Sequence, residues 1–257
     1  MQRLLFKVRT GKIMGRDHIH SRRNCQDGCT VKFIAIDGQE FLVGVVSDGC
    51  GSGKASEVAG ILLPQFVVNQ IEHLLRFETP ILQIPVSLYP YVVAYLDGIR
   101  KQIPFSSPAD VVQFINDHLL ATAIGFVIGQ DEGIVFHAGD GFLVVNDEII
   151  KIEHGNKSPY PAYHLVPRSA LKGEVVLPRT FDVRVVNPAK LKRLVVATDG
   201  FRGGMLERML KETFQKPFLG ETGVQRWMNW INGSRNPDPD AGLFFDDAAI
   251  VSLEKID

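Results

Sequence analysis

The chain has 257 residues, of which 45% are hydrophobic and 22% are charged, and its formal net charge is −1. This composition is typical of a globular protein, and the near-zero net charge disfavours a nucleic-acid partner. The three cysteines form no disulfide-rich pattern and no uninterrupted apolar run reaches the length of a bilayer, so we expect a cytoplasmic protein with no membrane partner.

The predicted elements form two halves in which strands come first and helices follow. In the first half, apolar runs predict strands at residues 2–8, 29–36 and 40–47, and a helical period predicts helices at residues 54–76, 90–102 and 108–118. In the second half we expect strands at residues 120–129, 133–138, 142–146, 148–152, 173–177, 181–186 and 192–198, helices at residues 204–214 and 222–231, and a last strand at residues 247–253. The first run lacks the apolar core and cleavage site of a signal peptide. Hairpin-linked strands with helices in two batches indicate an α+β fold with antiparallel sheets, as a single domain over residues 1–257.

Four short acidic motifs adjoin apolar, β-branched runs that we interpret as buried strands. They are Asp48-Gly49, Gly139-Asp140-Gly141, Asp199-Gly200 and Asp246-Asp247. Carboxylates that meet at strand ends repel one another and stay ionised together only when a cation lies among them. Oxygen ligands suit hard divalent cations such as Mg²⁺ and Mn²⁺. The pattern therefore predicts a metal site made of carboxylates, and metal-ion catalysis.

The order and spacing of these motifs resemble those of the metal-dependent protein phosphatases of the 2C type, in particular a bacterial subgroup. The matching segments, which span nearly the whole chain, are Gln26-Asp27, Asp48-Gly49-Cys50-Gly51, Gly139-Asp140-Gly141, Thr198-Asp199-Gly200 and Asp246-Asp247. The resemblance implies a four-layer αββα sandwich of two mostly antiparallel sheets flanked by helices. It also implies a hydrolase that removes phosphate from serine and threonine of phosphorylated proteins by attack of a metal-bridging hydroxide.

The resemblance also assigns the catalytic carboxylates, which are the main metal ligands. Asp48 would bridge two Mn²⁺ or Mg²⁺ ions, and the carbonyl of Gly49 would bind one of them. Asp199 and Asp246 would each complete the ligand shell of one ion. These residues would therefore carry both the metal site and the reaction.

Further roles follow from the same resemblance. Asp27 would hold metal-bound water, and Asp140 would help to bind a third ion. The phosphate-binding arginine of the family lies five residues before the early aspartate, which here is Arg22, and the adjacent Arg23 is a second candidate for substrate binding. A solvated basic turn is the alternative interpretation of this arginine pair.

The chain departs from the family pattern at two positions that matter for the chemistry. Cys50 replaces the histidine of the Asp-Gly-His-Gly turn, and Gln26 replaces a glutamate beside Asp27. A thiol is a poor acid for an alkoxide leaving group, so we assign the proton donor to His18, with His20 as the alternative.

Three other interpretations stay open at this stage. The departures at Cys50 and Gln26 are compatible with a pseudophosphatase, in which the same fold serves as a binding or regulatory module. A metal-dependent nuclease also uses carboxylates, but the chain lacks a basic patch. Cys25 and Cys29 with a nearby histidine are compatible with zinc, although no Cys-x-x-Cys pair is present. The sequence indicates neither the phosphoprotein substrate nor an oligomeric state.

Overall fold

The computed structural model describes residues 6–155, 158–171, 175, 177–202, 204–214, 223–233 and 244–256. The strands are β1 Phe6–Ile13, β2 Gly28–Ile36, β3 Gln39–Ser47, β4 Ala123–Ile128, β5 Gly133–Ala138, β6 Gly141–Val145, β7 Glu148–Ile152, β8 Asp182–Val186, β9 Arg193–Ala197 and β10 Ala248–Lys255. They form two five-stranded sheets, sheet A in the order β1-β10-β9-β6-β7 and sheet B in the order β2-β3-β4-β5-β8. Every pairing between these strands is antiparallel.

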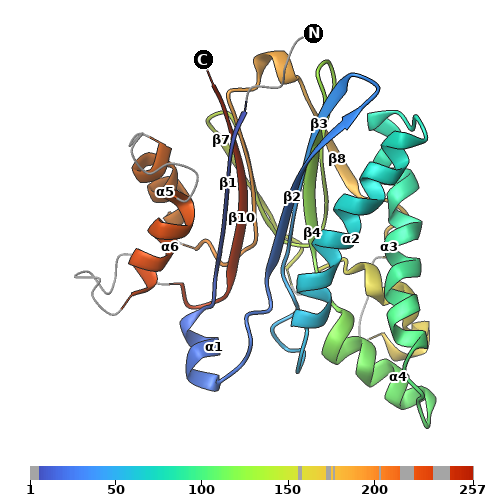
Figure 1. The fold of residues 1–257 in the computed structure, drawn as a ribbon. Coiled ribbons are helices and arrows are strands. Elements are labelled where there is room, and N and C mark those ends of the chain that lie inside the picture. Colours follow the sequence, from blue (N-terminus) through green and yellow to red (C-terminus); the bar gives the residue numbers. More distant parts are fainter. Residues whose placement is uncertain are drawn as a thin grey trace.

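Helices cover the outer face of each sheet, so the molecule has four layers (Figure 1). The helices are α1 Arg16–Ser21, α2 Glu57–Arg76, α3 Ile84–Lys101, α4 Pro108–Phe114, α5 Met205–Phe214 and α6 Gly223–Asn232. Short helical turns lie at Ile81–Gln83, Ile115–Leu119, Pro161–Leu165, Arg168–Ala170 and Pro188–Lys190. Helix α2 packs on β2 and β3 of sheet B, α3 packs beside α2, and α6 packs on β1 of sheet A. This arrangement confirms the predicted αββα sandwich.

Three apolar cores lie between the four layers. Phe126 lies in the core between the two sheets, Leu63 in the core between sheet B and its helices, and Trp227 in the core between sheet A and its helices. A central strand such as β3 is covered on both faces, and each of its residues from Phe41 to Ser47 is buried. Burial on both faces explains why these strands appear in the sequence as continuous apolar runs.

Helix α2 combines great length with an apolar composition. It has 20 residues, and by length and composition alone it could cross a membrane. Half of that stretch is buried within the protein, as expected of a helix that lies on a sheet. Pro64, which interrupts the predicted helical pattern, is buried inside α2 without ending it.

The observed elements differ from the predicted ones at three places. Helix α3 begins at Ile84 and not at residue 90, because Pro85 occupies the first helical turn, where proline needs no hydrogen-bond donor. Strand β1 extends to Ile13, beyond the predicted end at residue 8, and the short helix α1 was not predicted. The strand predicted at residues 173–177 falls mostly outside the described residues.

Candidate metal centre

Antiparallel pairing brings the acidic turns to one end of the sandwich. In sheet A, Ala197 at the end of β9 pairs with Phe142 at the start of β6 and lies opposite Ile250 of β10. In sheet B, Ser47 at the end of β3 pairs with Gly28 at the start of β2. The acidic residues next to these strand ends therefore share that end of the sandwich, and they are Asp27, Asp48, Asp140, Asp199 and Asp246.

The backbone of Asp48 is fixed by hydrogen bonds to the neighbouring strand. Its N–H donates to Thr122 Oγ1 at 2.9 Å, and its carbonyl accepts from the N–H of Thr122 at 2.8 Å. Gly49 leaves no room for a side chain, because a Cβ there would lie 2.7 Å from the carbonyl oxygen of Ser56 and 2.9 Å from that of Gln26. The carboxylate of Asp48 and the carbonyl of Gly49 are thus presented from a rigid turn.

The two candidate phosphate-binding arginines have different surroundings. Arg23 donates from its guanidinium to the carbonyls of Gly51, at 2.6 Å, and Gly53, at 3.0 Å, and so holds the glycine-rich turn after Asp48. Arg22 is exposed, and its side chain has no ion pair or hydrogen bond within the described part of the chain. Arg22 is therefore the more available of the two for a phosphoryl group.

Asp199 is fixed against β10 in a comparable way. The N–H of Thr198 donates to the carbonyl of Ala249 at 3.0 Å, and the N–H of Ala249 donates to Thr198 Oγ1 at 2.8 Å. A Cβ on Gly200 would lie 1.9 Å from the carbonyl oxygen of Asp247. Only glycine fits this close approach, which explains the Asp-Gly order of the motif.

The carboxyl groups at this end raise one another's pKa. Burial raises the pKa of Asp27 to about 8, and the charges of Asp247 and Asp246 add to that rise. Burial raises the pKa of Asp48 well above its usual range, with further contributions from Asp27 and Asp199. Burial and the charge of Asp246 also raise the pKa of Asp199. The carboxylates are therefore close enough to repel, as the sequence predicted.

The donor set suits a hard divalent cation. All of the converging side chains offer oxygen, which Mg²⁺ and Mn²⁺ prefer. Asp27 Oδ2 is buried and has no hydrogen-bond partner among the residues that the structure describes, and an ion or its water would satisfy it. Within the described ranges, no three His, Cys, Asp or Glu side chains are already gathered closely enough to hold an ion. The residues fit a metal in kind, and a bound ion would have to draw the carboxylates closer together.

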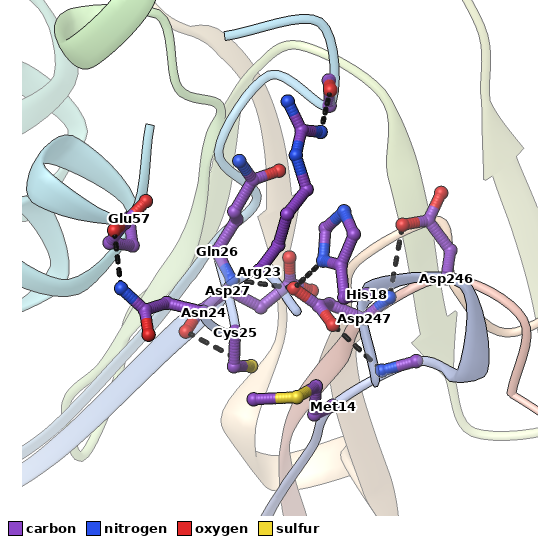
Figure 2. A network of polar contacts seen from close by, with 12 residues as sticks. Met14, His18, Arg23, Asn24, Cys25, Gln26, Asp27, Glu57, Asp246 and Asp247 are labelled. Carbon is purple, nitrogen blue, oxygen red and sulfur yellow. Dashed lines mark hydrogen bonds and ion pairs between the residues drawn. The ribbon is translucent and has the colours of Figure 1, made fainter. Parts of the chain in front are cut away.

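Asp247 joins three segments that are far apart in the sequence (Figure 2). It accepts hydrogen bonds from the N–H of Gly15 at 2.7 Å and from the N–H of Gln26 at 2.5 Å. Its Oδ2 also lies 2.7 Å from Nδ1 of His18, and both side chains are buried. Asp247 thereby connects α1 and the segment before Asp27 to the start of β10. It acts as a structural acceptor.

The two candidate histidines lie in different environments. The ring of His18 is buried against Asp247, whereas His20 is exposed and its Nδ1 lies 2.7 Å from the carbonyl oxygen of Arg16. Figure 2 shows the second edge of the His18 ring turned away from Asp247, toward the side on which the side chains of Arg23 and Asp246 stand. His18 is thus the histidine that faces the acidic end.

Asp140 is satisfied by a histidine that the sequence did not single out. Its Oδ1 accepts from the backbone N–H of His154 and lies near Nδ1 of the same residue, both at 2.7 Å. Asp140 contributes to the raised pKa of Asp199, after burial and Asp246. It therefore lies beside Asp199, where the resemblance placed a third ion.

The cysteines do not form a zinc site in the described residues. Burial raises the pKa of Cys25 to about 12 and also raises that of Cys29, so both thiols stay protonated. Cys50 Sγ lies 3.2 Å from Ser52 Oγ in the glycine-rich turn.

Arg202 is the main functional candidate that the sequence analysis missed. Its Nη2 lies 3.0 Å from Asp246 Oδ2, and its charge opposes the rise in the pKa of Asp199 that burial and Asp246 cause. It also lines a cavity of about 840 Å³ together with Asp140, Asp199 and Lys151. The feature of the sequence that could have identified Arg202 is its position, three residues after Asp199.

Comparison with known proteins adds a family and a set of similar folds. A family model described as Protein phosphatase 2C matches residues 14–231. Serine/threonine phosphatase Stp1 from Staphylococcus aureus is 15% identical with a TM-score of 0.61, and the match covers 100% of this chain and 97% of that one. The catalytic domain of serine threonine protein phosphatase PstP in complex with two manganese ions is 16% identical with a TM-score of 0.51, and the match covers 98% and 99%. A bacterial serine phosphatase is 14% identical with a TM-score of 0.56, and the match covers 98% of each chain. A search of curated proteins finds no match.

Proposed function

The chain belongs to the protein phosphatase 2C family, and we propose that it is a Mn²⁺- or Mg²⁺-dependent phosphatase of phosphoserine and phosphothreonine in proteins. This proposal is supported mainly by the cluster of carboxylates at one end of the sandwich, because these carboxylates raise one another's pKa. A protein gains nothing in stability from such repulsion, so we infer that a cation binds there.

The proposed metal ligands are Asp48, the carbonyl of Gly49, Asp199 and Asp246, with Asp27 holding associated water. When bound, such ions would activate water and neutralise charge on the phosphoryl group. The two manganese ions in the PstP structure support Mn²⁺ as the choice. A third ion would take Asp140 together with Asp199.

The protein's own side chains orient the substrate and move a proton. Arg22, which is exposed and lies five residues before Asp27, would bind the phosphoryl oxygens through its planar guanidinium. His18 would donate a proton from Nε2 to the serine or threonine oxygen as it leaves. Its pairing through Nδ1 with Asp247 supports this role, because the carboxylate fixes the ring and turns Nε2 outward. Arg23 holds the glycine-rich turn in place.

The test is hydrolysis by the purified protein of a phosphoserine peptide and of 4-nitrophenyl phosphate, with Mn²⁺ and with excess EDTA. We expect turnover with Mn²⁺ and none with EDTA. Mn²⁺ uptake by calorimetry without turnover would instead support the pseudophosphatase, which the set of retained carboxylates disfavours. The cytoplasmic location stays a prediction from the cysteine content.

A further inference from the structure

Arg202 lies on the turn between β9 and α5, next to the carboxylates. Its N–H donates to the carbonyl of Gly200 at 3.1 Å, and its own carbonyl accepts from the N–H of Met205 at 3.1 Å. These bonds fix the backbone but leave the side chain free to turn. The guanidinium reaches Asp246 on the segment before β10, at 3.0 Å.

The ion pair between Arg202 and Asp246 is open to solvent. The side chain of Arg202 is 63% exposed and that of Asp246 is 39% exposed. An exposed pair of this kind changes an equilibrium constant by about fivefold at most. The pair is therefore too weak to be needed for folding, and another partner can replace either member at low cost.

The surroundings of Arg202 favour such a replacement. Asp246 and Asp199 both lie near its guanidinium, and both are proposed metal ligands. A divalent ion bound to them would remove most of the negative charge that now attracts Arg202 and would repel its positive charge. The phosphoryl group of a substrate at the same carboxylates would then be the nearest anion, and a planar guanidinium binds phosphate oxygens in pairs.

We propose that Arg202 exchanges partners, pairing with Asp246 in the metal-free protein and binding the phosphoryl group of the substrate in the metal-loaded protein. This rests on the proposed function, since it requires a metal and a phosphate at these carboxylates. Arg202 is then a substrate-binding residue in addition to Arg22. It also competes with the metal for Asp246, so it weakens metal binding and strengthens phosphate binding.

The experiment uses the whole chain and two titrations that need no turnover. Mn²⁺ is titrated into metal-free protein by calorimetry, and inorganic phosphate is then titrated into Mg²⁺-loaded protein. In Arg202→Gln we expect Mn²⁺ to bind about two- to fivefold more tightly, because its competitor is gone. Phosphate should bind about tenfold more weakly, because a charged hydrogen-bond donor is gone. Arg202→Lys keeps the positive charge but loses the paired N–H donors of the guanidinium. It should leave Mn²⁺ affinity near that of the unaltered protein and weaken phosphate binding by less than Arg202→Gln does.

A matched control is Arg100→Gln, which removes an arginine that is paired with Asp97 on α3 at 2.7 Å. It should change neither titration. Opposite shifts in Arg202→Gln support the exchange, because a disturbed fold would weaken both titrations. Unchanged or weaker Mn²⁺ binding, or unchanged phosphate binding, would overturn it. If the unaltered protein binds Mg²⁺ and phosphate but hydrolyses no phosphomonoester, the proposed function fails while the two titrations still decide the role of Arg202.

Discussion

Two groups of aspartates at the same end of the sandwich differ in how the protein satisfies them. Asp247 accepts two backbone hydrogen bonds and pairs with His18, and Asp140 pairs with His154. Asp27, Asp48 and Asp199 instead lie near other carboxylates, and their pKa values rise through burial and mutual repulsion. Carboxylates of the first group have partners that offset their charge, whereas those of the second group lie mainly among like charges, and Arg202 offsets part of this repulsion at Asp199.

This difference separates Asp247, a structural aspartate, from the aspartates reserved for a ligand. Asp140 combines the two roles, because it pairs with His154 and lies beside Asp199. A buried carboxylate that accepts several N–H donors connects segments and stabilises the fold. A set of buried carboxylates that repel one another destabilises the metal-free protein, which indicates that a cation binds there. Removing a member of each group tests this separation.

The largest effect should come from the group of aspartates that lie among like charges. We expect Asp48→Ala and Asp199→Ala each to lower Mn²⁺-dependent hydrolysis of 4-nitrophenyl phosphate by about a thousandfold, because each removes a metal ligand. The thermal stability of the metal-free protein should not fall, since a repelling charge is lost in each variant. Asp97→Ala, which removes a carboxylate paired with Arg100 and Lys101 on α3, serves as the control. Full activity in both variants would contradict the proposed site.

Removing an aspartate from the group with partners should instead lower the stability of the metal-free protein. Asp247→Ala leaves the N–H groups of Gly15 and Gln26 and the ring of His18 without their acceptor. We expect the free energy of unfolding of metal-free protein to fall by about 3 kcal/mol in urea denaturation. Unchanged stability of Asp247→Ala would show that the carboxylate does not hold these segments together.

His18 connects the two groups of aspartates, because its ring is paired with Asp247 and also faces the candidate metal centre. If it protonates the leaving oxygen, His18→Gln should lower kcat on a phosphoserine peptide by about a hundredfold. The loss on 4-nitrophenyl phosphate should be small, since a nitrophenolate leaves without a proton. Equal losses on the two substrates would instead indicate that His18 only positions Asp247 or the neighbouring backbone.

The smallest effect is the pH dependence of stability in the metal-free protein. The folded-state pKa of Asp27 is about 8, against an ordinary value of 3.8, and the pKa values of Asp48 and Asp199 are also raised. Between these values the folded state keeps protons that the unfolded state has lost, so stability falls as pH rises. We expect the Tm in EDTA to drop by several degrees between about pH 5 and pH 8. Mn²⁺ should raise the Tm most at the higher pH. A Tm in EDTA that rises over this range would contradict the separation.

Much of the fold was predictable because the pattern is local. Apolar runs ending in Asp-Gly predicted β3 and β9, and helical spacing predicted α2 in spite of Pro64. The predicted helix began too late, at residue 90, because Pro85 lies in the first turn of α3, where a helix tolerates proline.

The partners of the site residues were less predictable. Asp247 contacts residues that are 221 to 232 positions away in the sequence, and no spacing pattern in the sequence predicts such contacts. The ion pair of Arg202 with Asp246 also joins two separate turns, 44 positions apart. Only the register of the two sheets brings these segments together.

The sequence by itself determined which residues carry the negative charge and that they lie next to buried strands. Residue type and hydrophobic period are local properties, and they suffice for that conclusion. The tertiary structure decided which aspartates are satisfied by donors and which lie mainly among other carboxylates. That outcome depends on burial and on neighbours from distant segments, which a linear pattern does not contain.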